Sequence, residues 1–283
     1  MITFQQWLHQ TTQLLSGVTD TASLDARVLL AYCLDKPQSY LLTWPEKPMT
    51  NELLVEVNEL RSRRAKGEPI AYITGFQEFW SLEFNVNPAV LIPRADTELM
   101  VEWALEIIEA SKNKNLKLLE LGTGSGAISI ALAKAHPELQ LVATDFSEAA
   151  LSIAEENAEL NQCSNIEFIQ GSWFDCLTGR TFDLIVSNPP YLAPTDPHLL
   201  DDTLKFEPRQ ALVAEKNGLA DSEEIIKTAK LHLRLGGRLG LEHGYEQSEA
   251  IIGIMQREGY LNSKTLRDLA GLDRLSICNR GED

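Results

Sequence analysis

Strand-like and helix-like segments alternate from residue 116 almost to the end of the chain. Short apolar runs such as Leu116–Leu121 are separated by longer segments of helical periodicity such as Ala127–Ala135. Parallel strands need long crossover connections, which are usually helices, so the alternation predicts a mostly parallel sheet covered by helices on both faces. We therefore expect an α/β, doubly wound, seven-stranded sheet. Its expected strands are 116–121, 141–144, 166–170, 184–187, 238–242, 263–266 and 274–278, and its expected helices are 127–135, 148–161, 221–235 and 247–258.

The first part of the chain has a different pattern. Residues 1–75 are expected to form a small helical domain, in which Ser23 and Thr50 precede helix-like segments as N-caps. The aromatic-rich stretch that follows partly alternates between apolar and polar residues, which predicts a β-hairpin within a linker at 76–95. Residues 96–283 are expected to form the main domain, starting with a helix that ends near Ala110.

Composition narrows the classes of function. The 283 residues are 44% hydrophobic and 23% charged, which is typical of a globular protein. The net charge of −16 disfavours non-specific binding of nucleic acid, because such binding depends on a basic surface that displaces counterions from the phosphates. We expect no direct DNA binding and a monomer. The N-terminus lacks a signal-peptide pattern, and the chain lacks an apolar run long enough to span a membrane, so we expect a cytoplasmic protein without membrane contact.

The four cysteines are scattered along the chain without the spacing of metal ligands. We expect them to be reduced thiols and expect no metal site. They are Cys33, Cys163, Cys176 and Cys278.

Three glycines at alternate positions lie between the first strand of the expected sheet and its helix. Gly122, Gly124 and Gly126 permit a tight turn and let a ligand approach the backbone where a Cβ would block it. The spacing differs from the dinucleotide fingerprint, and the loop lacks the lysine of a phosphate loop. Asp145 ends the next strand, where an acid can accept hydrogen bonds from ribose hydroxyls. The pattern predicts a site for a nucleotide-like cofactor.

The segment Asn188-Pro189-Pro190-Tyr191 follows another buried strand. The Asn188 side-chain oxygen and the Pro189 carbonyl could each accept one N–H of a planar amide or amino group, and Tyr191 could pack against that group. Such a loop would act by orientation and by carbonyl dipoles. The structural alternative is a rigid turn in which the prolines fix φ and Tyr191 covers the core. Beside the glycine loop, the segment indicates methyl transfer from a sulfonium to an amide or amino nitrogen.

At these motifs the chain resembles the PrmC/HemK family, which methylates the glutamine side-chain nitrogen in peptide-chain release factors. The likeness extends over nearly the whole chain. Ala95 and Leu272 depart from the usual family pattern, outside the core motifs. The other segments that carry the resemblance are Gly67–Gly75, Glu78–Trp80, Leu91–Arg94, Glu120–Leu121, Gly171–Asp175, Phe206–Arg209 and Asp268–Gly271.

The resemblance implies a class I methyltransferase that uses S-adenosylmethionine and releases S-adenosylhomocysteine. It implies that the helical domain helps to hold the release factor, whose reactive glutamine lies in a Gly-Gly-Gln loop, and that the reaction supports translation termination. The implied cofactor-binding residues are Gly122, Thr123, Gly124, Ser125, Gly126, Asp145, Trp173 and Asn188. The implied substrate-binding residues are Asn188, Pro189, Pro190 and Tyr191, of which Asn188, Pro189 and Tyr191 are the catalytic ones.

Two other functions remain as alternatives, and three single residues can each be interpreted in more than one way. An adenine-amino methyltransferase of DNA or RNA would share the Asn-Pro-Pro-Tyr segment, and a scaffold without turnover would share the glycine loop. Trp173 could stack on adenine or belong to the core. Arg94 could face the cofactor's carboxylate or the substrate, or form a structural ion pair. Glu120 could accept from the cofactor's amino group or orient the loop.

Overall fold

The computed structural model describes residues 1–111, 113, 115–201 and 203–281. The chain divides into two compact units, one of Met1–Phe76 with Leu200–Phe206 and one of Gln77–Leu199 with Glu207–Asp283. Each unit has its own hydrophobic core among the described residues. Within these ranges, no helix combines the length and the apolarity needed to cross a bilayer.

The first unit is helical. Thr50 caps its fourth helix by accepting a hydrogen bond from the N–H of Leu53, as predicted. The second helix begins at Ala22 after Thr21, so the predicted cap Ser23 lies inside that helix. The helices are α1 (Phe4–Leu15), α2 (Ala22–Leu34), α3 (Gln38–Thr43), α4 (Asn51–Arg64) and α5 (Ile70–Thr74).

A buried ion pair links two helices of this unit. The Arg64 guanidinium at the end of α4 lies 2.7 Å from the Asp25 carboxylate on α2, and both side chains are almost fully buried. Its neighbour Arg63 pairs with Glu68. Arg63 and Arg64, two of the basic residues at the end of α4, therefore have partners inside the helical unit.

The predicted hairpin is confirmed as a two-stranded sheet of β1 (Phe76–Phe79) and β2 (Leu82–Asn85). The turn is held by the Trp80 N–H, which donates to the Glu98 carboxylate at 3.0 Å. Glu98 is the first residue of α6 (Glu98–Ala110), which follows the short helix η1 (Ala95–Thr97).

The second unit is built on a seven-stranded sheet of order β5-β4-β3-β6-β7-β9-β8. β3 pairs in parallel with β4 and β6, β4 with β5, and β6 with β7, whereas β9 runs antiparallel to β7 and β8. The predicted mostly parallel, seven-stranded sheet is thus confirmed. The strands are β3 (Lys117–Leu121), β4 (Gln140–Asp145), β5 (Ile166–Gln170), β6 (Phe182–Ser187), β7 (Leu233–Glu242), β8 (Leu261–Arg267) and β9 (Asp273–Asn279).

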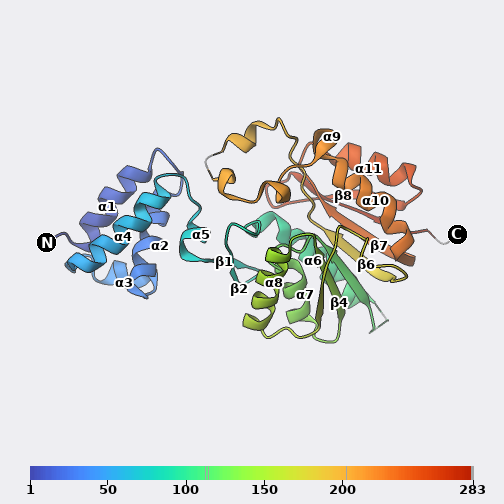
Figure 1. Cartoon of the computed structure of the whole chain (residues 1–283), viewed down its shortest axis with the longest axis horizontal. Helices are drawn as coiled ribbons and strands as arrows, with labels where there is room; N and C mark the ends of the chain where they lie inside the picture. The colour runs from blue at the N-terminus through green and yellow to red at the C-terminus, as the bar shows by residue number, and fades with distance from the viewer. Residues whose placement is uncertain (112, 114, 202, 282–283) are drawn as a thin grey trace. The chain divides into compact units, whose positions relative to one another are not determined.

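Helices cover both faces of this sheet (Figure 1). Successive residues of a strand point to opposite faces, so Leu118 packs into one core with α6 and α7, and Leu119 into the other with α10 and α11. Besides α6, the helices of this unit are α7 (Ala127–Ala135), α8 (Glu148–Leu160), α9 (Glu215–Gly218), α10 (Ala220–His232) and α11 (Ser248–Arg257). The short helices that follow β6 in the chain are η2 (Pro197–Leu200), η3 (Leu204–Phe206), which belongs to the first unit, and η4 (Arg209–Ala211).

The boundary between α10 and β7 differs from the prediction. The helix was expected to reach Leu235, but it ends at His232 and the strand starts at Leu233. Leu233 is fully buried and pairs with Phe182 of β6. Pairing across the sheet therefore overrides the local helical pattern at this point.

The order of the strands reverses between β3 and β6. From β3 the chain continues outward to β4 and β5, then returns to place β6 on the other side of β3. Leu121 and Ser187, the last residues of these two strands, lie opposite each other. The loops that follow them therefore start side by side at the switch point, where doubly wound sheets bind their ligands.

Candidate functional site

A cavity of about 370 Å³ lies at the carboxyl ends of β3, β4, β5 and β6. The structure brings most of the predicted site residues together around it, whereas Gly126, Pro189 and Tyr191, which are also among the described residues, do not line it. The predicted residues that line the cavity are Gly122, Thr123, Gly124, Ser125, Asp145, Trp173, Asn188 and Pro190.

The three glycines of the loop have positive φ angles of 69°, 56° and 83° at Gly122, Gly124 and Gly126. A Cβ at Gly122 would lie 3.4 Å from the Trp173 ring, which is an ordinary van der Waals contact distance. Gly122 and the ring therefore lie close together in the cavity wall. A Cβ at Gly126 would lie 2.8 Å from Ile130 Cδ1 and 3.2 Å from Ala154 Cβ. Gly126 therefore serves the close packing of α7 against α8, while Gly122 and Gly124 face the cavity.

Asp145 joins the glycine loop to the end of β4. Its Oδ2 accepts the Gly124 N–H at 2.8 Å and its Oδ1 accepts the Ser147 N–H at 2.9 Å. Burial raises the carboxyl pKa, and the backbone hydrogen bonds oppose that rise. The Phe146 N–H also bonds to this carboxylate, so three backbone donors occupy three of its roughly four acceptor positions, and one position remains for a donor from a ligand.

Glu120 lies beneath the loop and is almost fully buried. Its Oε2 accepts the Thr123 hydroxyl at 2.8 Å and the Ser129 N–H at 3.1 Å, and also the Ser129 hydroxyl. Burial raises its pKa to about 7, and these hydrogen bonds oppose the rise. Glu120 thus ties the start of the loop to the first turn of α7, which supports the interpretation that it orients the loop.

Trp173 follows β5 and forms part of the cavity wall as well as packing against the core. Its indole N–H hydrogen-bonds to Asp221, whose pKa is raised mainly by burial. Asp221 also lines the cavity but lies at the start of α10. The sequence pattern marked Asp221 only as the start of a helix, so it was missed as a site residue.

Asn188 is fixed by a contact far along the chain. Its Nδ2 donates a hydrogen bond to the Thr97 hydroxyl at 3.2 Å. Thr97 also lines the cavity. The carbonyl of Tyr191, at the end of the same segment, accepts from Gln247 Nε2 at 2.9 Å. Burial, reinforced by the Glu242 charge, raises the Tyr191 pKa to about 12, which keeps its hydroxyl protonated.

Arg94 lines the cavity and forms an ion pair with Glu207. The Glu207 side chain is buried, and its carboxylate also accepts the Ile92 N–H at 3.1 Å. These contacts hold Glu207 against the Ile92–Arg94 segment. For Arg94 the structure therefore shows the structural ion pair, and Glu207 is a second residue that sequence reasoning did not single out.

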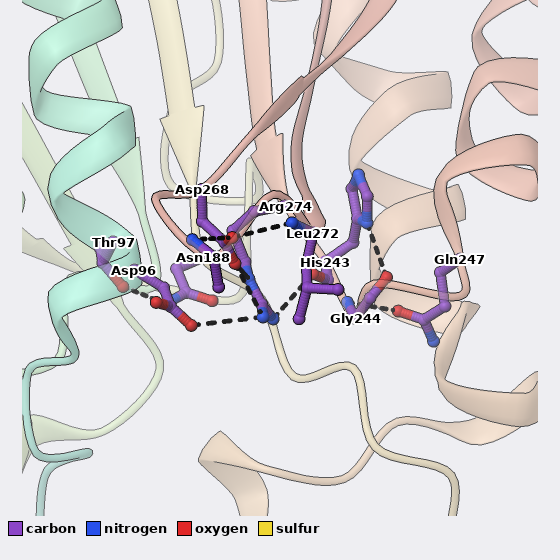
Figure 2. A network of polar contacts seen from close by, with 10 residues as sticks. Asp96, Thr97, Asn188, His243, Gly244, Gln247, Asp268, Leu272 and Arg274 are labelled. Carbon is purple, nitrogen blue, oxygen red and sulfur yellow. Dashed lines mark hydrogen bonds and ion pairs between the residues drawn. The ribbon is translucent and has the colours of Figure 1, made fainter.

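A charged network lies next to this cavity (Figure 2). Arg274 Nη2 lies 3.2 Å from Asp96 and 3.3 Å from Asp268. Asp268 also accepts the backbone N–H groups of Ala270 and Leu272, so it holds its own turn in place. The network joins η1, β9 and the turn between β8 and β9.

The cavity has the features of a site for a nucleoside-like ligand beside a planar nitrogen. Its volume of about 370 Å³ lies within the range of small-molecule sites. The Asp145 carboxylate can accept a hydroxyl group, the Trp173 ring offers a flat apolar surface, and the Asn188 side chain carries an acceptor oxygen.

Comparison with known proteins yields matches over most of the chain. A family profile described as the PrmC N-terminal domain matches residues 6–75, and one described as a methyltransferase domain matches residues 112–271. The release factor glutamine methyltransferase of Aliivibrio fischeri is 47% identical over 92% of this chain and 90% of that protein. That of Salmonella typhimurium is 44% identical over 98% of each.

Among solved structures, a methyltransferase from Pyrococcus furiosus matches with a TM-score of 0.53 and 22% identity, over 78% of this chain and 99% of that one. The catalytic domain of hMettl16 matches with a TM-score of 0.57 and 17% identity, over 80% and 83% of the two chains. At these identities the likeness shows a shared fold. The predicted methyltransferase fold is thereby confirmed.

Proposed function

This chain belongs to the family of release factor glutamine methyltransferases, and we propose that it transfers a methyl group from S-adenosylmethionine to the side-chain amide nitrogen of the glutamine in the Gly-Gly-Gln motif of peptide-chain release factors. The observation that carries this proposal is that Asn188 and the glycine loop line the same cavity at the switch point. The modification would support translation termination, and the cytoplasm is its expected location.

The residues around the cavity fit the proposed cofactor. Asp145 is proposed to accept hydrogen bonds from the two ribose hydroxyls, and the Trp173 ring to stack on the adenine. Gly122 and Gly124 allow close approach because neither has a side chain at the cavity surface. The bound cofactor supplies a methyl group on a positively charged sulfur. The full proposed set is Gly122, Thr123, Gly124, Ser125, Gly126, Asp145, Trp173 and Asn188, in which Gly126 does not line the cavity and would act by setting the shape of the loop.

The Asn-Pro-Pro-Tyr segment is proposed to hold the substrate amide. An amide nitrogen is a poor nucleophile, so its reaction depends on orientation and on dipoles that stabilise the developing charge. The Asn188 side-chain oxygen and the Pro189 carbonyl are proposed to accept the two amide N–H groups. Pro190 lines the cavity and Tyr191 follows it, so we place both beside the planar group.

The three segments predicted from the sequence are proposed to have separate roles in methylation of the release factor. Residues 1–75 would help to hold the release factor, residues 76–95 would link the two parts, and residues 96–283 would carry the cofactor and the reaction. The net charge of −16 disfavours a nucleic-acid substrate. We therefore propose a protein substrate, no direct DNA binding and a monomeric enzyme.

A labelling experiment tests this function. The purified protein is incubated with tritiated S-adenosylmethionine and, separately, with unmethylated release factor, with release factor whose Gly-Gly-Gln glutamine is changed to alanine, and with adenine-containing duplex DNA. We expect label in the unaltered release factor alone. Label in DNA alone, or in both release factors equally, would contradict the proposed substrate.

A further inference from the structure

Glu242 is a buried carboxyl beside Asn188, and the proposed reaction so far gives it no role. It is the last residue of β7, which pairs with β6 immediately before the Asn-Pro-Pro-Tyr segment. The residue is only 2% exposed. Within the described part of the chain, its Oε2 has no hydrogen-bond partner. A carboxyl in such a position is costly, since burial without full pairing disfavours its charged form.

Two side chains with polar groups next to the cavity reach this carboxyl. Thr97 and Asn188 both lie within hydrogen-bonding reach of Glu242 and lower its pKa. The Thr97 hydroxyl also accepts the Asn188 Nδ2–H at 3.2 Å. A hydroxyl can donate one hydrogen bond and accept others at once, so Thr97 can accept from Asn188 and still donate to Glu242.

These contacts decide which way the Asn188 amide points. Its NH₂ group faces two acceptors, the Thr97 hydroxyl and the Glu242 carboxylate, which leaves Oδ1 without a role in this cluster. The reversed amide would set Oδ1 against the carboxylate, two acceptors with no proton between them. It would also present an NH₂ group to the substrate's own NH₂ group.

We propose that Thr97 and Glu242 are positioning residues that fix the Asn188 side-chain amide with its Oδ1 available to the substrate glutamine. This inference rests on the proposed function, because it assumes that Asn188 accepts an N–H of the substrate amide. Thr97 and Glu242 act through Asn188.

The charges around Glu242 are consistent with this role. Burial raises its pKa to about 7, while the hydrogen bond from Thr97 and the Arg274 charge lower it and the Asp96 charge raises it. Tyr191 also faces the carboxyl. Arg274 is held next to η1 by Asp96 (Figure 2). The Arg274 guanidinium opposes the effect of burial, and above about pH 7 the carboxyl is mostly ionised. The ionised carboxylate can only accept hydrogen bonds and therefore selects the NH₂ group of Asn188.

The test compares Thr97→Val with Thr97→Ser in the intact enzyme. Valine keeps the shape and removes the hydroxyl, so we expect kcat for release factor methylation to fall about tenfold, the factor for one hydrogen bond. Serine restores the hydroxyl and should recover most of that loss. The dissociation constant for S-adenosylmethionine should change less than about twofold. Thr11→Val is the matched control, since Thr11 is fully buried in α1 and its hydroxyl has no partner among the described residues.

A double-mutant cycle separates positioning from a general structural effect. In single-turnover assays, Thr97→Val should cost about tenfold in the wild-type background and almost nothing in the Asn188→Ala background. Glu242→Gln replaces a carboxylate that only accepts hydrogen bonds with an amide that both donates and accepts them, and it should behave in the same way. This variant replaces Thr97→Val in the test if the valine variant folds poorly. Equal losses in both backgrounds, or no loss in either, would overturn the inference. Failure of the proposed function would be visible separately, as absence of label with the wild-type enzyme.

Discussion

Asp145 shows how a single side chain serves both the loop and the ligand. It accepts the N–H groups of Gly124 and Ser147 and thereby sets the shape of the glycine loop. Its carboxylate is also the group proposed to receive the ribose hydroxyls. Removing it should therefore weaken cofactor binding twice, through the lost contacts and through a looser loop.

We expect Asp145→Ala to weaken S-adenosylmethionine binding by at least about 100-fold, since two hydrogen bonds to a charged group, each worth about 1.5–3 kcal/mol, amount to about 3 kcal/mol or more. Titration calorimetry measures the dissociation constant directly. Asp20→Ala is the control, because Asp20 is an exposed residue of the helical unit. An unchanged dissociation constant in the Asp145 variant would remove this residue from the proposed site.

Asn188→Ala should act on the reaction more than on cofactor binding. Its side chain is proposed to orient the substrate amide, so its loss should lower kcat by at least about 100-fold. The dissociation constant of the cofactor should change much less. Steady-state kinetics with saturating cofactor separate these two effects, and near-normal turnover would disprove the role of Asn188.

Burial of Glu120 predicts a dependence of stability on pH. Its pKa is raised to about 7, so the folded state favours the protonated form more than the unfolded state does. The stability associated with this group is present in full below its unfolded pKa and is lost as the pH rises towards the folded value. Relative to Glu120→Gln, the wild-type protein should lose up to about 3 kcal/mol between about pH 5 and about pH 8. Denaturant unfolding at both pH values measures this difference, and a constant difference would contradict it.

At the scale of elements, the alternation of strands and helices predicted the sheet because each short apolar run corresponds to one buried strand. The glycine loop and the Asn-Pro-Pro-Tyr segment could be located for the same reason, as each directly follows such a run. The start of β7 could not, since pairing with Phe182 draws Leu233 into the sheet. Glu207 and Glu242 were missed because their partners, Arg94 and Asn188, are distant in sequence and meet them only after folding.

The packing of α7 against α8 can be tested at Gly126. A Cβ there would clash with Ile130 and Ala154 at a φ of 83°, so Gly126→Ala should destabilise the protein by about 2 kcal/mol. Gly253→Ala is the matched control, because Gly253 lies in α11 and an alanine there meets only the end of the Arg257 side chain. We expect that control to be neutral or stabilising. Thermal unfolding of both variants compares them, and equal melting temperatures would contradict the packing role.

At the scale of the whole molecule, two compact units are joined in one acidic chain. The change of pattern after residue 75 indicated a separate helical part, and the units in the structure divide near the same point, at Phe76. The grouping of Leu200–Phe206 with the helical unit was not predicted, because a short segment distant in sequence leaves no local periodicity that reveals it. The substrate-holding role of the helical unit stays a prediction.

One glutamine side chain of the release factor is proposed to receive the methyl group. The most direct measurement is mass spectrometry of peptides from release factor treated with the enzyme and S-adenosylmethionine. A mass increase of one methyl group, assigned by fragmentation to the side chain of the Gly-Gly-Gln glutamine, is the predicted result. A methyl group on another residue, or a Gly-Gly-Gln peptide that stays unmodified after prolonged incubation with enzyme and S-adenosylmethionine, would contradict the proposed reaction.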